Sequence, residues 1–262
     1  MPVTEPFYPK KVTCLYCHHD FKGLRVRSRF AIPYQIDSDF CTHYRFGNYV
    51  PYYYYVDVCP SCGFAFTEEF TDKFAPGTRE LIQAKVGAQW DKRDYAHVRN
   101  VQAAIECYKL AIYAGTLKQE RHVAMAGLCL RLAWIYRTEQ NGEQEQRFLA
   151  LALNEYEESY KRSDFNSTKM TEMKVLFLCG ELSRRLGQYN KAISYFSRVI
   201  EHPDADDEIK MVNMSRAQWG EAVRQYRDEK RGGGADVVEV HWAYDYKVTA
   251  NDCGGALLGV GG

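Results

Sequence analysis

The sequence lacks the features that would place it in a membrane or draw it to a charged partner. Its 262 residues carry 34 basic and 34 acidic side chains, so the formal net charge is zero and no long-range field steers the whole chain toward nucleic acid or lipid. The opening MPVTEPFYPKK has no apolar signal-peptide core, and apolar runs such as VLFLC are far too short to span a bilayer. We therefore expect a cytoplasmic protein with no membrane partner.

Recognisable catalytic motifs are missing as well. The sequence contains no H-E-x-x-H, no G-x-S-x-G and no phosphate-binding loop, and no G-x-G-x-x-G follows an expected strand. Without such motifs, the sequence identifies no catalytic residue, no cofactor-binding residue and no small-molecule substrate. We accordingly expect a protein that is not an enzyme.

Proline is scarce in most of the chain, and this scarcity divides the sequence. Residues 78–230 contain a single proline and read as successive amphipathic helices, whereas residues 1–75 hold most of the prolines and four paired cysteines. The sequence APGT interrupts the chain between the two parts. We predict an α+β, mainly α protein: a small N-terminal β module over 1–75 that resembles a zinc ribbon, helices over 78–230, and a poorly ordered glycine-rich tail over 231–262.

The helical part has a repeating pattern. In LFLCGELSRRLGQYNKAISYFSRVIEHPD, small and aromatic residues fall at the spacing of the roughly 34-residue tetratricopeptide repeat. Gly180 and Ala192 would let two antiparallel helices approach closely, Gly187 would make the turn between them, and Phe196 would fill the remaining gap. We expect about three such hairpins and a capping helix, stacked as an antiparallel helical-hairpin solenoid.

Two segments of the first part alternate like half-buried strands. In FKGLRVRSRF three apolar residues alternate with three arginines, which would place the guanidinium groups on one sheet face. In VPYYYYVDV, tyrosines would fall on both faces of a second strand. Arginines neutralise phosphates and exposed aromatic rings stack on bases, so this surface is a candidate for nucleic-acid binding. Its candidate contacts are Lys22, Arg25, Arg27 and Arg29.

Nine cysteines are an odd number, and structural disulfides are not expected in a chain without an export signal. Two C-x2-C pairs stand 41 residues apart, and each pair lets two thiolates face one ion. Pro60 would stiffen the second turn, and Gly63 would let it adopt a positive φ. We expect a structural Zn²⁺ site, although the same ligands could hold iron, and a redox pair or independent buried thiols are the alternatives. The four ligands would be Cys14, Cys17, Cys59 and Cys62.

The segment between the pairs holds two further candidate ligands, Cys41 and His43. They could replace a ligand or cover the site, although four thiolates already complete a tetrahedral shell. Metal binding in small zinc modules contributes on the order of 10 kcal/mol. We therefore expect the substitution Cys59→Ser to unfold the N-terminal module and to leave the helices intact.

The paired cysteines, the segment DSDFCTHYRFGNYVPYYYYVDVCPSCGFAF and the helices that follow resemble the uncharacterised bacterial family catalogued as domain of unknown function 2225. The resemblance covers about residues 8–230. It implies this architecture, with tetratricopeptide-like helices, and no established activity. The family's features fall on Cys14, Cys17, Asp37, Asp39, Phe40, Cys41, Val58, Cys59, Pro60, Cys62 and Gly63.

The two parts together favour an adaptor or scaffold. Stacked helical hairpins generally form a concave surface that binds partners, so we expect a protein or peptide partner in that groove and a metal-bound ribbon as a rigid end. The alternative function is binding of single-stranded RNA or DNA through the basic, tyrosine-rich ribbon. Catalysis by residues brought together only in the fold is the third hypothesis.

Overall fold

The structure is a computed structural model that describes residues 5–47 and 49–232. The protein is mainly helical, with three short two-stranded antiparallel sheets in its first part, β1–β2, β3–β4 and β5–β6. The strands are β1 Phe7–Thr13, β2 Asp20–Val26, β3 Pro33–Ile36, β4 Thr42–Tyr44, β5 Asp57–Val58 and β6 Ala65–Phe66. The α-helices are α1 Thr78–Lys85, α2 Val101–Lys118, α3 His122–Thr138, α4 Gly142–Arg162, α5 Glu172–Arg185, α6 Tyr189–Ile200 and α7 Ile209–Gly232. Short 3-10 helices are η1 Ser28–Phe30, η2 Pro51–Tyr54, η3 Gly87–Gln89 and η4 Asp164–Ser167.

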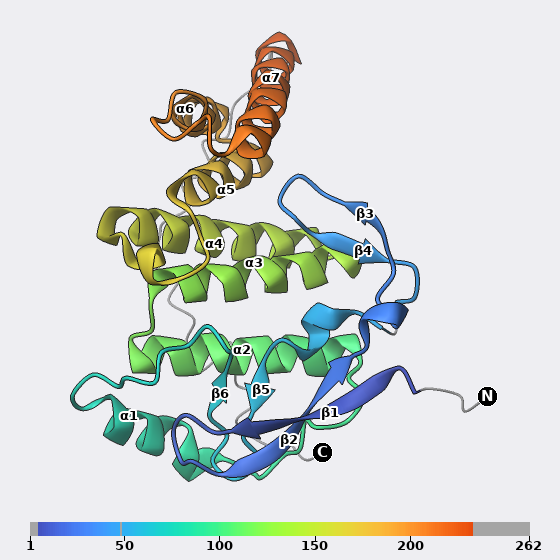
Figure 1. Ribbon diagram of the computed structural model, residues 1–262, viewed down its shortest axis with the longest axis vertical. Coiled ribbons are helices and arrows are strands. Elements are labelled where there is room, and N and C mark those ends of the chain that lie inside the picture. Colours follow the sequence, from blue (N-terminus) through green and yellow to red (C-terminus); the bar gives the residue numbers. More distant parts are fainter. Residues whose placement is uncertain (1–4, 48, 233–262) are drawn as a thin grey trace.

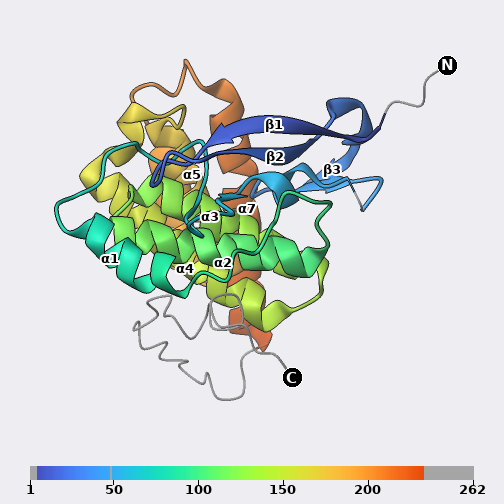
Figure 2. The same cartoon turned by 90° about the horizontal axis from the view of Figure 1, so that it is seen from below.

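The helices follow one another through the molecule in chain order. Figure 1 shows α2, α3, α4 and α5 one above another, with α6 and α7 at the far end. Helix α3 packs on α4, α5 on α6, and α6 on α7. The view from below in Figure 2 places α1 and α2 nearest the reader, with the β1–β2 hairpin along one side. Side-chain caps begin three of these helices: Asn100, Asn141 and Thr171 each accept a hydrogen bond from a backbone N–H of the first turn.

The first 75 residues share a core with the helices. One cluster of buried apolar residues runs from Val12 to Ala222. The hydroxyl of Tyr108 in α2 donates to the Tyr52 carbonyl at 2.8 Å, and the buried guanidinium of Arg99 donates to the carbonyls of Tyr53 in η2 and of Val56, which precedes β5. The break expected after residue 75 therefore separates β6 from α1 along the chain, while the side chains on its two sides pack together.

The tyrosine run does not form the strand that its alternation predicts. Pro51 begins η2, a single turn of 3-10 helix, and only Asp57 and Val58 continue as a strand. In a one-turn helix the side chains point in successive directions around the axis, so no exposed face alternates with a buried one. The rings of residues 52–54 are all buried, among them Tyr54 beside Phe7 with ring centroids 5.4 Å apart.

The arginine-rich segment is shorter as a strand than its sequence predicts. Strand β2 ends at Val26, and η1 follows. Of the three arginines expected on one sheet face, only Arg25 belongs to β2. The single face of three guanidinium groups is therefore absent from this part of the described chain.

The predicted helical hairpin near the C-terminal end is present as α5 and α6. Gly187 turns the chain between these helices with a φ of 73°. A Cβ on Gly180 would lie 2.8 Å from the Cε1 atom of Phe196. The Phe196 ring therefore fits against α5 because residue 180 has no side chain.

The last described helix extends beyond its predicted end. Helix α7 continues to Gly232, so the first two residues of the expected tail are helical. The rest of that prediction concerns residues 233–262, which lie outside the described residues. None of the helices in the described part is both long and apolar enough to cross a membrane.

Candidate metal centre

The first cysteine pair lies in the turn between β1 and β2. The backbone N–H of Cys14 donates to the His19 carbonyl, and the N–H of His18 donates to the Cys14 carbonyl, both at 3.0 Å. His18 takes the left-handed conformation that closes this turn, with a φ of 61°. The turn therefore brings Cys14 and Cys17 to one side of the hairpin end.

The second pair lies in the turn between β5 and β6. The Gly63 N–H donates to the Cys59 carbonyl at 2.9 Å, and the Cys59 N–H donates to the Phe64 carbonyl at 3.0 Å. Gly63 has a φ of 72°, the positive value expected from the sequence. The turn directs Cys59 and Cys62 toward the first pair.

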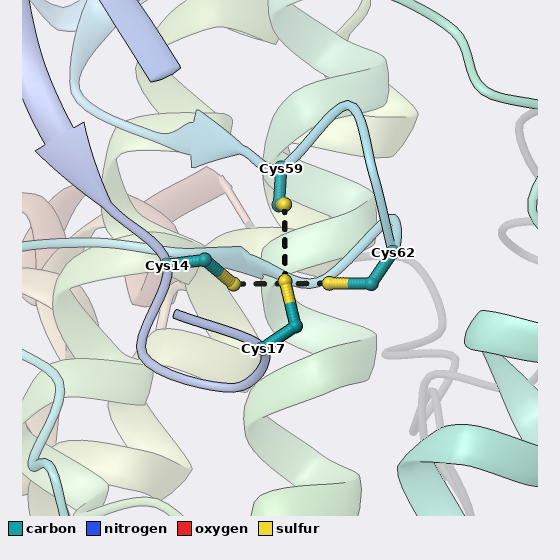
Figure 3. A group of neighbouring side chains, drawn as sticks. All are labelled: Cys14, Cys17, Cys59 and Cys62. Carbon is teal, nitrogen blue, oxygen red and sulfur yellow. Dashed lines mark hydrogen bonds between the residues drawn. The ribbon is translucent and has the colours of Figure 1, made fainter. Parts of the chain in front are cut away.

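The four sulfur atoms meet with the spacing of a tetrahedral metal shell. The Sγ atoms of Cys14 and Cys62 are 3.7 Å apart, those of Cys17 and Cys59 are 3.6 Å apart, and all four lie within 4.8 Å of one another (Figure 3). Zn–S bonds of 2.3 Å place the sulfurs of a tetrahedron about 3.8 Å apart. A disulfide would need about 2.05 Å, and all four thiols are free. The residues present therefore fit a metal ion.

The thiols influence one another's protonation. Hydrogen bonds with Cys14 and Cys62 hold the pKa of Cys59 at about 2, helped by backbone N–H groups. Hydrogen bonding with Cys59 and burial raise the pKa of Cys14 to about 12 and also raise the pKa of Cys62. The neighbouring sulfurs thus favour the thiolate of Cys59 and oppose deprotonation of Cys14 and Cys62, and a bound cation would reverse that opposition.

Trp90 covers the second turn, and the spacing of the cysteines gave no indication of it. Its indole Nε1 donates to the Pro60 carbonyl at 3.0 Å. A Cβ on Gly63 would lie 2.5 Å from the Trp90 Cδ2 atom, so the ring rests directly on the glycine. The one signal in the sequence is a tryptophan in the polar stretch QWDKRDYAH, which has no helical apolar period.

Helix α1 holds the first turn in place. The hydroxyl of Tyr16 donates to the Arg79 carbonyl at 3.1 Å, and the Arg79 guanidinium donates back to the Tyr16 carbonyl at 2.9 Å. The same guanidinium lies 4.2 Å from the ring centroid of Phe74. These contacts fix the Cys14–Cys17 turn relative to the helical part.

Cys41 and His43 lie apart from the four-cysteine cluster. They belong to the β3–β4 hairpin and form a separate group with Asp37. In Figure 1 this hairpin lies beside the ends of α3 and α4, whereas β1, β2 and β5 lie lower in the picture, around and below α2. The structure thus places these two candidate ligands in a second location.

The hairpin loop is anchored by acids and arginines that sequence reasoning did not connect. Asp39 is fully buried, accepts from Arg137 Nη2 at 2.6 Å and accepts from Trp134 Nε1 at 3.2 Å. The Ser38 hydroxyl donates to the buried Glu181 of α5 at 2.6 Å. The D-x-D-F-C segment therefore docks onto α3 and α5, with partners 98 and 143 residues away in the chain.

The four candidate nucleic-acid contacts do not form one surface. Arg25 is mostly buried and pairs with Asp57 at 2.6 Å, so its charge is neutralised within the protein. Lys22, Arg27 and Arg29 are exposed, and the Arg27 guanidinium lies 5.2 Å from the ring centroid of Tyr8. The buried tyrosines 52–54 offer no ring for base stacking.

Fold and site define a mainly helical protein with an N-terminal cluster of four cysteines that could hold a metal ion. The chain belongs to the bacterial family described as "Uncharacterized protein conserved in bacteria (DUF2225)", whose model matches residues 7–222. No curated protein and no solved structure was found to match it.

Proposed function

We propose that this protein is a non-enzymatic adaptor that binds a protein or peptide partner. Its tetratricopeptide-like helices are the framework, and its four cysteines hold a structural Zn²⁺, with iron as the alternative ion. The observation that carries the proposal is the apolar surface of the β3–β4 hairpin, which consists of the exposed side chains Ile32, Tyr34, Ile36 and Phe46.

Large apolar side chains of this hairpin are exposed to solvent. Tyr34 is 62 % exposed and Ile36 is 63 % exposed, and all four residues of β3 are exposed. Among the described strands β3 pairs with β4 alone, so its other edge has backbone groups available to an added strand. An extended peptide that pairs with this edge and covers these side chains would satisfy both features.

The hairpin is held rigidly enough to act as a preformed surface. Its loop is fixed by the contacts of Asp39 with Arg137 and of Ser38 with Glu181. A surface that is already ordered loses little conformational entropy when a partner binds. The helices supply further apolar contacts at the far end, where Ile209 and Trp219 of α7 are exposed.

The metal centre supports a structural role for the ion. Four thiolates fill a tetrahedral shell and leave no position for water or substrate. Cys14 and Cys59 are fully buried, and Trp90 covers the turn next to Cys59. The ion would join the β1–β2 hairpin to the β5–β6 hairpin, whose strands have two residues each.

The test is affinity capture from native bacterial lysate with nuclease present, using the full chain and three double variants. The hairpin variant is Tyr34→Ser with Ile36→Ser, and the helix variant is Ile209→Ser with Trp219→Ser. The matched control carries serine at the exposed residues Leu81 and Val98, which lie outside both surfaces.

We expect a defined protein set that the control retains and the hairpin variant loses. Loss with the helix variant as well would extend the surface to α7. Retention of the same set by the hairpin and helix variants, or capture of no reproducible set, would contradict the proposal.

Nucleic-acid binding is the second candidate, and one surface feature favours it. A hollow beside β1 and β2 is lined by Tyr8, Val26, Arg27, Ser28 and Arg29, which combines two cations with an exposed aromatic ring. Binding of single-stranded RNA that weakens with salt and with the substitution Arg27→Ala would support this function. Undetectable or salt-independent binding would remove it.

A further inference from the structure

The β3–β4 hairpin brings three metal-binding side chains together at its closed end. Asp37 follows β3, Cys41 precedes β4, and His43 lies within β4. The Asp37 N–H donates to the Cys41 carbonyl at 2.8 Å, and Phe40 has a φ of 68°, so the loop between them is a tight turn. The thiol sulfur, an imidazole nitrogen and a carboxylate oxygen of these residues all lie within 4.8 Å of one another.

These three atoms are of the types that ligate a tetrahedral ion, and they lie within 4.8 Å of one another. Zinc binds thiolate at about 2.3 Å and imidazole or carboxylate at about 2.0–2.2 Å, which places the ligand atoms of a tetrahedron about 3.3–3.8 Å apart. The His43 Nε2 to Asp37 Oδ2 distance is 3.0 Å. Small rotations of these side chains would bring all three donors onto one ion.

The imidazole of His43 lies beside the Asp37 carboxylate. Its Nε2 is sealed from solvent and makes no hydrogen bond of acceptable geometry within the described residues, although a carboxylate oxygen of Asp37 lies 3.0 Å away. A buried polar nitrogen without a partner is costly. An ion bound beside both groups would give this nitrogen a partner.

Charged side chains surround the hairpin loop. Four carboxylates are offset by three guanidinium groups and by the Lys174 ammonium, which lies 5.4 Å from the ring centroid of Phe40, so the group is neutral overall. A Cys41 thiolate would make it negative, and a bound cation would offset that charge. The carboxylates and guanidinium groups are those of Asp37, Asp39, Glu145 and Glu181 with Arg137, Arg184 and Arg185.

Neighbouring side chains already hold the carboxylate in position. Gln35 Nε2 donates to Asp37 Oδ1 at 3.0 Å, and Arg137 Nη1 donates to Asp37 Oδ2 at 2.8 Å. Ligating carboxylates are usually hydrogen-bonded in this way by outer groups. The guanidinium itself is balanced by Asp39 and Glu145, at 2.6 Å and 2.7 Å.

We propose that Asp37, Cys41 and His43 form a second metal site, separate from the four-cysteine centre, which binds a divalent transition-metal ion such as Zn²⁺. Three protein ligands leave the fourth position to water or to a small exchangeable ligand, unlike the closed four-sulfur shell. The side chains of Asp37 and His43 are 14 % and 19 % exposed, so solvent reaches the edge of the site. This site does not depend on the adaptor function.

The first test is metal stoichiometry of the full chain by equilibrium dialysis against micromolar free Zn²⁺. We expect two ions per chain in the wild type and one in Cys41→Ala and in His43→Gln. The matched controls are Cys129→Ala, a buried thiol of α3, and His97→Gln, an exposed imidazole, and both should retain two ions. One ion in the wild type, or two in both hairpin variants, would overturn the proposal.

Cobalt substitution separates loss of the site from loss of the fold. Co²⁺ in the four-cysteine centre should give intense sulfur-to-metal charge-transfer absorption, and the second Co²⁺ should add a weaker contribution because a single sulfur contacts it. In His43→Gln and Asp37→Asn the intense absorption should persist while the second contribution disappears. A second contribution unchanged in Asp37→Asn, with the intense absorption intact, would also count against the site.

Discussion

The contact between Trp90 and the second cysteine turn makes a quantitative prediction for the substitution Gly63→Ala. Gly63 has a φ of 72°, and a left-handed conformation costs a residue with a Cβ about 1–2 kcal/mol. The new Cβ would lie 2.5 Å from Trp90 Cδ2, and crowding of this kind costs about 1–3 kcal/mol. Displacing the indole also breaks its hydrogen bond to the Pro60 carbonyl, worth about 1 kcal/mol. We expect a total loss of about 3–6 kcal/mol.

Two other glycines provide a matched control for backbone strain. Gly77 and Gly187 have φ values of 79° and 73°, and a Cβ on either would meet nothing within 4 Å. Gly77→Ala and Gly187→Ala should therefore cost only the conformational strain, about 1–2 kcal/mol. The entropy that alanine removes from the unfolded chain is common to all three substitutions and cancels in the comparison.

The assay is urea denaturation of the zinc-loaded full chain, followed by tryptophan fluorescence and circular dichroism. We expect Gly63→Ala to lose about 2–4 kcal/mol more than either control. A parallel chelator competition should show weaker zinc binding in Gly63→Ala, because the displaced ring moves the turn that carries two ligands. Equal losses in all three variants would refute the conclusion that Trp90 supports the metal-binding turn.

Three further predictions concern the metal, a buried thiol and the contact between the two parts of the chain. Cys59→Ser should lose the ion of the four-cysteine centre, whereas Cys107→Ser should retain it. The measurement is metal content after gel filtration. Retention of the ion in Cys59→Ser would contradict the assignment of Cys59 as a ligand. Burial raises the pKa of Cys107 to about 12, so about one thiol in ten thousand is ionised at pH 8. Iodoacetamide should therefore label Cys107 only after the protein unfolds in urea. Rapid labelling of the native protein would be the contrary result. Arg99→Met should lower the free energy of unfolding by about 3–5 kcal/mol, because the buried carbonyls of Tyr53 and Val56 lose their donor; a change below about 0.5 kcal/mol would be inconsistent with this contact.

The features predicted well from the sequence are those fixed by neighbours in the chain. Each cysteine pair forms a turn because two-residue spacing is a local property, and Gly63 has the positive φ that the second turn requires. The α5–α6 hairpin is likewise decided by Gly187 at the turn and by the small Gly180 facing Phe196. Each cysteine turn is complete within a few residues, and the α5–α6 hairpin is complete within about thirty.

The features that the sequence could not predict depend on distant partners. Period-two alternation suggested a strand for the tyrosine run, but Pro51 starts a helical turn and the rings pack on residues far away, such as Tyr52 against Trp134 at 6.0 Å between centroids. Arg25 looked like a surface cation because its partner, Asp57, is 32 residues away. No local pattern shows such pairings.

The shared core changes what the metal should do for the whole protein. From the sequence, a zinc ribbon over residues 1–75 would unfold by itself when its ion is lost. In the structure, Arg99 and Tyr108 donate to carbonyls of residues 52, 53 and 56, which lie directly before the second cysteine pair. Helix α2 also packs on β5 and β6, the strands that flank this pair. Loss of the ion would therefore uncover the buried face of α2 as well, and its effect should fade toward α5–α7, which pack on one another and of which α6 and α7 lie at the far end of the molecule.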